Sequence, residues 1–516
     1  MSFFSPFLNR VWKRGLFVFL FFAIILAAIQ FSFSGLLDTD PYYHIQHAAL
    51  YNQGLSAETF PWVQLTPYAK NYSDLWYGFH QLLRILPSDN LIFSGKLFVV
   101  CIGALVFTVF YLLLTRLKIP KPFFWTAALV GLCPYFLYRL LSLRPHLFDV
   151  LFLLACLLFL MEKRRWLLGI LMAIFVWFHE LAPLLLVVVV LWSATESIAN
   201  KRLEWKTPLA ALIGFGVGIA LHPGPVMYLY SMYLVLLKIP IFANLGYIKN
   251  FGTEVEANFF GVSGSLIFWL SNFGFLLLSF LAAIILMMKK NHAPSTPHFC
   301  LLMITLFWFL LSIVTARGME WFAPLVILFI AFTVKETCSE WFVRITNKTK
   351  TRLLLVIFVF SALLQLHQIQ SPDDFKYIQS YFPAAKWLEE NTPPETLVAN
   401  QWDVFPYLFF ENQSNYYTNA YDPIFLYEYD PKLSWLWFHL WAEGTLCETR
   451  SCETSDDEVA TFDVGDVLAD RFHLSYIVVH SQRESKKFLE LLAASKRLTS
   501  RFTDGSIIVY GPKESL

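Results

Sequence analysis

The sequence carries little charge. Asp, Glu, Lys and Arg make up 15% of its 516 residues, whereas soluble domains carry about 25%. The net charge is only +1, so no basic footprint for nucleic-acid binding is visible. The seven cysteines show no zinc-binding spacing, and the chain has no internal repeat and no low-complexity segment. These absences argue against an ordinary soluble domain, a nucleic-acid partner and a zinc module.

What the sequence does contain is apolar and aromatic. Hydrophobic residues make up 57% of the chain, with 52 Phe and 17 Trp, which suits a lipid-facing protein with aromatic rings at the membrane interface. Near the start, three basic residues precede an apolar run at 16–30. A cleaved signal peptide has a shorter apolar core and a small-residue cleavage site. We therefore expect this run to be the first membrane helix, with the N-terminus in the cytoplasm.

Apolar runs that could cross a bilayer recur along the first two thirds of the chain. A helix needs about 20 apolar residues to span the hydrocarbon core, and by this measure we predict about eleven spans. They lie near 15–36, 91–115, 122–143, 147–161, 166–179, 181–197, 207–222, 264–288, 298–316, 321–337 and 352–370.

The distribution of basic residues tests this count, because cytoplasmic loops are enriched in Lys and Arg. Basic clusters occur in every second loop, near 10–14, 116–121, 163–165, 201–206, 289–290 and 335–352. The alternation favours eleven crossings, including the short pair 166–179 and 181–197 as a hairpin. It places the N-terminus inside and the C-terminus outside.

Three segments are expected on the outer side. Two are long loops at about 37–90 and 223–263, and the third is the polar and aromatic region 372–516. Within that region we predict a strand at 476–479, a helix at 484–494 and a strand at 506–510. The expected fold is thus a polytopic α-helical membrane domain (1–371) followed by a small extracytoplasmic α/β domain (372–516).

Ionisable residues concentrate at the predicted outer ends of the helices. Inner loops carry mainly Lys and Arg, as topology requires, but the outer turns also carry carboxylates and imidazoles. Either these are helix-end residues in the headgroup zone, or they line a common cavity, which we favour because such groups at membrane depth are usually functional. They are Asp38, Asp40, His44, Arg144, His146, Asp149, His179, Glu180, His222, Glu254, Glu256, Arg317 and Glu320.

Asp38 and Asp40 follow the first predicted helix directly. Two carboxylates two residues apart reach one ion only if the chain turns, and Pro41 favours a turn. They could serve as a catalytic base, as ligands of a divalent cation, or as both, and oxygen ligands suit Mg²⁺ or Mn²⁺. The alternative is that they cap a helix at 42–51, since Asp is a favoured cap.

The cysteines fall into two groups. Five lie in or beside apolar runs, where they are expected to be small apolar filler. Cys447 and Cys452 lie in the polar C-terminal region. If that region is extracytoplasmic, we expect them to form a disulfide that closes a short loop.

The stretch Asp38-Thr39-Asp40-Pro41-Tyr42-Tyr43-His44 after an apolar first helix resembles the first outer loop of GT-C membrane glycosyltransferases. With Ala48 it is especially similar to oligosaccharyltransferase catalytic subunits. The resemblance implies transfer of a sugar from a polyprenyl phosphate or diphosphate on the outer membrane face. It implies a catalytic role, as base or through a metal, for Asp40 first and Asp38 second.

Other motifs match these families in part. Trp177-Phe178-His179 is one residue shorter than a Trp-x-x-His pattern of bacterial members, and it points to His179. The segment Thr253-Glu254-Val255-Glu256 is reminiscent of a Thr-x-x-Glu element near the acceptor amide. Trp402 and Asp403 are what remains here of the Trp-Trp-Asp-Tyr-Gly motif that reads the acceptor sequon. The missing residues of that motif argue against transfer to asparagine.

The resemblance suggests a mechanism and leaves alternatives. Arg144 and Arg317 are candidates for the leaving phosphate, because a guanidinium binds phosphate at two points. We expect a multi-pass protein of the inner (plasma) membrane that uses a polyprenyl-linked donor and a lipid, glycan or protein acceptor. The alternatives are oligosaccharyltransferase-like transfer to protein, a transporter or flippase, and a non-catalytic scaffold.

Overall fold

The protein divides into two compact units. The computed structural model describes residues 6–87, 89–246, 265–289, 294–346, 372–452 and 462–513, together with Arg352 and Val356. The first unit comprises Met1–Leu37, Leu75–His222 and Thr253–Ser371, and the second comprises Asp38–Asp74, Pro223–Gly252 and Pro372–Leu516. The predicted span at 352–370 lies outside the described residues, apart from Arg352 and Val356.

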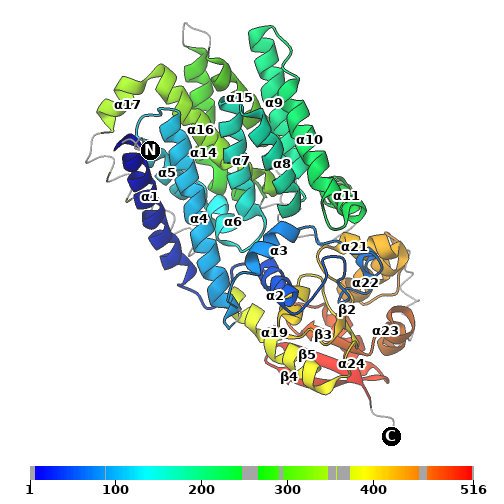
Figure 1. Cartoon of the computed structure of the whole chain (residues 1–516). Coiled ribbons are helices and arrows are strands. Elements are labelled where there is room, and N and C mark those ends of the chain that lie inside the picture. Colours follow the sequence, from blue (N-terminus) through cyan, green and yellow to red (C-terminus); the bar gives the residue numbers. More distant parts are fainter. Residues whose placement is uncertain are drawn as a thin grey trace. The chain divides into compact units, whose positions relative to one another are not determined.

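The first unit is built of helices, most of them apolar (Figure 1). They are α1 (Pro6–Gln30), α3 (Tyr77–Leu83), α4 (Leu91–Arg116), α5 (Pro122–Gly131), α6 (Pro134–Leu141), α7 (His146–Met161), α8 (Arg165–Phe178), α9 (Ala182–Asn200), α10 (Lys206–Ala220), α14 (Ser265–Met288), α15 (Thr296–Val314), η3 (Ala316–Gly318), α16 (Met319–Thr337) and α17 (Ser339–Ile345).

Five described helices are long and apolar enough to cross a membrane, or six if one bent pair counts as a span. The bent pair is α5 and α6, which meet at an angle of 85°. The sequence predicted one unbroken span at 122–143. Pro134 accounts for the break, because it lacks the N–H that a continuing helix uses and disfavours a helical residue before it. The helices α7, α8 and α10 are apolar but shorter.

The backbones of α8 and α10 approach each other very closely. A Cβ atom built on Gly214 would lie 1.9 Å from the carbonyl oxygen of Gly169, and one on Gly218 would lie 2.7 Å from that of Ala173. Small residues at helix interfaces allow such contact in membrane proteins. The two helices therefore pack backbone to backbone, and any larger side chain at Gly214 would separate them.

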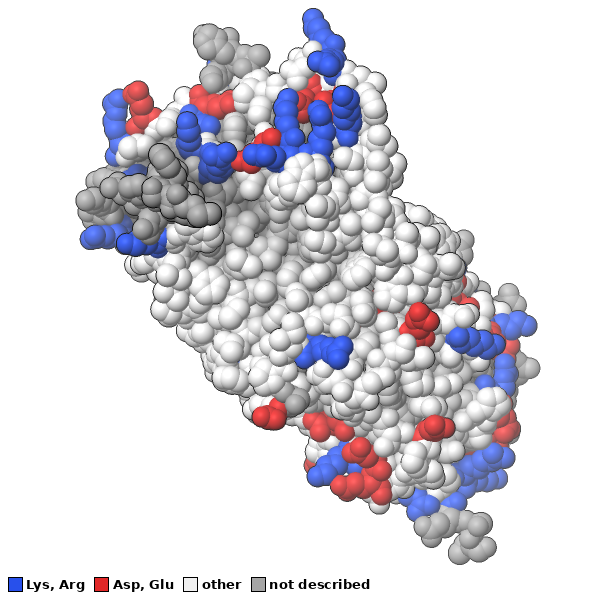
Figure 2. Space-filling view, viewed as in Figure 1, with Lys and Arg blue, Asp and Glu red and all other residues white. Residues whose placement is uncertain are grey.

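Charged side chains of the first unit gather at one end of its helices. Figure 2 shows them around the ends where α9 finishes and α10 begins, above a broad uncharged surface. Ion pairs join neighbouring loops there, including Arg116 with Glu162, Lys163 with Glu196 and Arg165 with Glu204. The basic partners Arg116, Lys163 and Arg165 belong to the clusters that the sequence predicted on the cytoplasmic side.

The second unit contains a five-stranded mixed sheet in the order β2-β1-β3-β5-β4. Strand β1 is parallel to β2 and to β3, whereas β5 is antiparallel to β3 and β4. The strands are β1 (Leu397–Ala399), β2 (Tyr416–Tyr417), β3 (Tyr476–His480), β4 (Leu498–Asp504) and β5 (Ile507–Pro512).

The helices of this unit come from three separate segments of the chain. The expected strand–helix–strand pattern corresponds to β3, α24 and β5, and the core joins Ile477 and Val479 of β3 with Phe488 and Leu492 of α24. The helices are α2 (Asp40–Asn52), η1 (Pro67–Ala69), α11 (Pro225–Tyr233), the π-helical turn η2 (Leu234–Lys238), α12 (Ile239–Asn244), α19 (Pro372–Asn391), α20 (Phe405–Glu411), α21 (Pro423–Tyr429), α22 (Pro431–Glu443), α23 (Val464–Phe472) and α24 (Lys486–Ala494).

The expected loop at 223–263 is largely helical where it is described. Helices α11 and α12 run on through η2, and Pro225–Phe242 is one of the five segments long and apolar enough to span. Pro240 follows the π-helical turn, and it lacks the N–H that a regular helix would use there.

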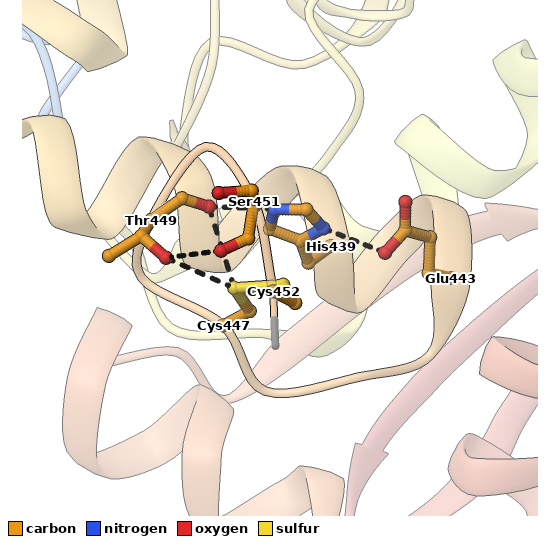
Figure 3. The surroundings of a disulfide bond; sticks show 6 residues. All are labelled: His439, Glu443, Cys447, Thr449, Ser451 and Cys452. Carbon is orange, nitrogen blue, oxygen red and sulfur yellow. Dashed lines mark hydrogen bonds and ion pairs between the residues drawn. A yellow bond between two sulfur atoms is a disulfide. The ribbon is translucent and has the colours of Figure 1, made fainter. Parts of the chain in front are cut away.

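Cys447 and Cys452 form a disulfide with a Cα–Cα distance of 5.9 Å. Figure 3 shows the loop that it closes beside His439 of α22. His439 Nδ1 lies 2.7 Å from Glu443 Oε2, and its Nε2 lies 2.9 Å from the Thr449 carbonyl oxygen. The imidazole therefore links the loop to the end of α22.

Candidate functional site

Asp38 and Asp40 stand at the start of α2. The helix begins at Asp40, and Thr39, not an Asp, occupies its N-cap without a side-chain cap bond. The Thr39 N–H donates to Asp38 Oδ1 at 2.7 Å, and the Thr39 hydroxyl donates to Asp40 Oδ1 at 3.2 Å. Asp38 has a φ of 79°, a left-handed conformation that costs energy for most residues but is tolerated by Asp. The chain thus turns at Asp38, whereas Pro41, which was expected to favour a turn, lies in the first turn of α2. Both carboxylates are half-buried.

Aromatic side chains of the second unit hold α2 in place. The ring of Tyr42 contacts those of Phe382, Tyr407 and Phe410, with centroids 5.2 to 5.9 Å apart. Burial raises the pKa of Tyr407, and the charge of Asp38 raises it further. The hydroxyl of Tyr407 therefore stays protonated near the acidic turn.

A buried group of hydroxyls extends from the next residue of α2. Tyr43 Oη lies 2.8 Å from His47 Nδ1 and 3.3 Å from Tyr72 Oη, and it accepts a hydrogen bond from Tyr421 at 3.1 Å. Burial raises the pKa of Tyr43, Tyr72 and Tyr421 well above the usual value. His44, one of the ionisable residues expected to line a common outer cavity, is buried with its ring 5.0 Å from that of Tyr43. This network ties the first loop to the C-terminal segment.

The first unit has its own buried polar group. Arg139 on α6 forms an ion pair with Glu320 on α16 at 2.5 Å. The backbone carbonyl of Arg139 accepts a bond from His146 Nε2 at 2.5 Å, and its guanidinium lies 3.4 Å from His146 Nδ1. The backbone carbonyl and the guanidinium of Arg139 thus hold the His146 ring in one orientation.

A second part of this group surrounds His179, in the turn between α8 and α9. His179 Nδ1 lies 2.7 Å from Asp149, and its Nε2 lies 3.4 Å from Glu180. Trp76 donates its indole N–H to Glu180 at 2.7 Å. An imidazolium donates from both nitrogens, so the doubly protonated ring suits this position between two carboxylates.

Four of the residues predicted for the site act within this group. His146 and His179 belong to it directly, Arg144 interacts electrostatically with His146, and Arg317 does so with Glu180. Sequence reasoning missed Arg139, although an Arg in the apolar run 135–143 is a signal, because ionisable residues in membrane segments are rarely incidental. Asp149, Glu180 and Glu320 were noticed as outer carboxylates but received no role.

Asp403 has a cationic partner in the second unit. Arg483 lies 2.6 Å from it and also donates to the Tyr377 hydroxyl. Burial alone would lower the pKa of Arg483, but Asp403 and Tyr377 raise it above its usual value. Trp402, next to Asp403, is half-buried. Glu254 and Glu256 lie outside the described residues.

The donor atoms at Asp38 and Asp40 are of the kind that Mg²⁺ or Mn²⁺ prefers. In the parts of the chain that the structure describes, no cluster of three His, Cys, Asp or Glu ligands includes either residue. The two carboxylates therefore fit a divalent cation by their chemistry, and they do not complete its coordination by themselves.

Comparisons with known proteins show the fold. No protein-family model matches the chain, and no curated protein matches it by sequence. Among solved structures, the oligosaccharyltransferase of Archaeoglobus fulgidus matches with a TM-score of 0.62 and 13% identity, over 96% of this chain and 72% of that one. ArnT from Cupriavidus metallidurans, solved with undecaprenyl phosphate, matches with a TM-score of 0.55 and 11% identity, over 97% and 98%. The chain thus shares the fold of these two proteins, which is the GT-C fold.

Proposed function

We propose that this protein is a membrane glycosyltransferase that takes a sugar from a polyprenyl-phosphate-linked donor on the non-cytoplasmic face of the inner (plasma) membrane. The observation that carries the proposal is the acidic turn of Asp38 and Asp40, at the start of α2, in a chain that has the GT-C fold. The undecaprenyl phosphate bound to ArnT supports a polyprenyl phosphate as the lipid part of the donor. The disulfide supports an oxidising, extracytoplasmic compartment for the second unit.

The reaction needs a base and a means to stabilise the leaving group. Asp40 is the proposed base, with Asp38 as the second candidate. It takes the proton of the acceptor nucleophile as that atom bonds to the anomeric carbon. The bond between that carbon and the lipid phosphate oxygen breaks, and the phosphate leaves with the electron pair.

The negative charge that gathers on the phosphate requires a cation. We assign this role to Arg317 and Arg144 of the first unit, whose guanidinium groups can each bind two phosphate oxygens. Asp38 and Asp40 would hold a divalent cation, if one is used, and it would supply further neutralisation of that charge.

Two arrangements bear on the alternatives. Asp403 forms an ion pair with Arg483, so its carboxylate is engaged within the protein. This disfavours a role for Asp403 in binding an acceptor peptide, as an oligosaccharyltransferase would require. The ion pair of Arg139 with Glu320 is the kind of buried group that also occurs in transporters and flippases. A flippase would move the lipid without cleaving it, and the assay below separates the two.

The test uses the full chain reconstituted in proteoliposomes. Short-chain polyprenyl phosphates carrying glucose, mannose, galactose or arabinose are supplied together with a mixture of membrane-lipid, glycan and peptide acceptors, and release of polyprenyl phosphate is followed by mass spectrometry. Loss of a positioned base costs about 100-fold or more, so Asp40→Asn should lower release by that factor. Glu58→Gln, an exposed carboxylate of the same segment, is the matched control and should leave release unchanged.

Equal release by Asp40→Asn and Glu58→Gln would contradict the role of Asp40. No release from any of the four donors by the unaltered protein, together with movement of intact donor across the bilayer, would favour the flippase. Arg317→Ala should raise the KM for the donor, because it removes a phosphate ligand from the proposed site.

A further inference from the structure

The helix formed by α11, η2 and α12 exposes an apolar stripe along its whole length. The members of the stripe follow one another at intervals of three or four residues, which places them on one face of a helix. Their exposed fractions lie between 42% and 81%. They are Val226, Leu229, Tyr233, Leu237, Ile241 and, one residue past α12, Leu245.

Polar contacts hold the helix to the rest of the second unit. Near its start, Tyr230 donates to Glu428 at 2.9 Å, and Ser231 accepts a hydrogen bond from Tyr68 at 2.7 Å. At its middle, Lys238 forms an ion pair with the same Glu428 carboxylate. Past its end, Arg450 donates to the Leu245 carbonyl at 2.9 Å. The helix therefore lies along the second unit, anchored at three levels.

The stripe itself carries no charge. Lys238 is the sole ionisable side chain of residues 225–245 with a charge at neutral pH, and its ion pair with Glu428 leaves it only 18% exposed. Six large apolar side chains in a row exceed the scattered hydrophobics of an ordinary surface and indicate an interaction face.

The basic clusters argue against a membrane crossing by this helix. Lys201, Arg202 and Lys206 precede α10, and Lys289 and Lys290 follow α14. Both clusters are predicted on the cytoplasmic side, so an even number of crossings must separate them. Helices α10 and α14 already supply two. A crossing by the helix between them would also place the pair of Lys238 and Glu428 in hydrocarbon, which is costly.

We infer that this helix lies in the plane of the membrane and inserts its apolar stripe among the acyl chains of the outer leaflet. One-sided apolar helices bind bilayers in this way. Lipid is the occupant that the chain favours, because only four residues separate α11 from the end of the apolar helix α10. The helix would give the second unit its own hold on the membrane, and this inference does not depend on the proposed reaction.

The experiment reads the surroundings of single spin labels in nanodiscs. The five cysteines outside the disulfide are replaced by Ala, and Leu237→Cys is labelled with a nitroxide. Accessibility to oxygen, which concentrates in lipid, is compared with accessibility to a water-soluble nickel chelate. Leu212→Cys, exposed on α10, gives the lipid reference, and Glu490→Cys, exposed on α24, gives the water reference.

We expect the oxygen-to-nickel ratio at Leu237 to match that at Leu212 and to exceed that at Glu490 several-fold. A ratio equal to that at Glu490 would overturn the inference, because the stripe would face water. Low accessibility of the label to both reagents would also overturn the inference, because the stripe would then be covered by protein. Spin–spin broadening would identify that protein as a second copy of the chain, and a spectrum without broadening would indicate a different protein. Val226→Cys and Ile241→Cys repeat the measurement should the Leu237 variant not fold.

Discussion

Arg139 and Glu320 form an ion pair in which both side chains are almost fully buried, with exposed fractions of 5% and 4%. The two residues are 181 positions apart in the sequence, and they join α6 to the first turn of α16. The pair also orients His146 through Arg139. It is therefore the central link of the polar group in the first unit.

Removal of one partner of this pair should be costly. Glu320→Gln leaves the Arg139 guanidinium buried without its counter-charge, and such a change costs about 3–5 kcal/mol. We expect a lower unfolding temperature in detergent, followed by tryptophan fluorescence. The double variant Arg139→Met with Glu320→Leu should recover much of the loss, because no charge remains buried. A Glu320→Gln protein as stable as the original would contradict the buried ion pair.

His179→Gln tests the imidazole between two carboxylates. Glutamine has one donor group and cannot serve Asp149 and Glu180 on opposite sides, so two like charges face each other, at a cost of about 1–3 kcal/mol. We expect a lower unfolding temperature and, in the donor assay, slower release. Adding Asp149→Asn should restore part of the stability. His473→Asn, at an exposed histidine, is the control and should change neither measurement.

The disulfide should stabilise the loop beside α22. A loop of about six residues closed by a disulfide gains ~2 kcal/mol in the chain-entropy model, so the double variant Cys447→Ser, Cys452→Ser should exchange amide hydrogens faster over residues 439–452. Cys338→Ser, outside the disulfide, should leave this exchange unchanged. Alkylation of Cys447 or Cys452 in the unreduced protein would show instead that the bond is absent.

His480 should make the second unit sensitive to acid. Burial, assisted by the charge of Arg483, lowers the pKa of His480 below 6.5, and its Nδ1 accepts a bond from the Gln482 N–H. The folded state thus binds the proton less readily than the unfolded state. The contribution of His480 to the free energy of unfolding is therefore complete above pH 6.5, and it declines as the pH falls below that value. Unfolding temperatures from pH 8 to 5 should fall less for His480→Gln, and parallel curves for both proteins would refute this.

Sequence patterns locate the helices of the first unit well, because insertion into lipid depends on local composition. The spans predicted at 91–115, 181–197 and 298–316 correspond closely to α4, α9 and α15. The bend between α5 and α6 was missed although Pro134 is visible in the sequence. The strands β1 and β2 were missed because three and two residues are too few for a periodic pattern.

The candidate site could be predicted only in its local part. Asp38 and Asp40 stand out because they lie two residues apart after an apolar run. Glu320, Tyr421 and Arg483, which are partners of Arg139, Tyr43 and Asp403, lie far along the chain from them, and no local periodicity marks these pairs. Such pairs follow from tertiary packing. The sequence therefore indicated one member of some pairs, such as Asp403, and gave no role to either member of others.

The close contact of α8 and α10 has a mechanical consequence. With Gly169 and Gly214 in backbone contact, neither helix can tilt without the other. Helix α8 has 14 residues and a length of about 21 Å, less than the ~30 Å of a typical hydrocarbon core. If both helices cross the membrane, as the sequence predicts, a thicker bilayer would strain them together, and the strain would reach His179 directly, since that residue follows the last residue of α8. On that topology the geometry around this imidazole would be coupled to the thickness of the surrounding lipid.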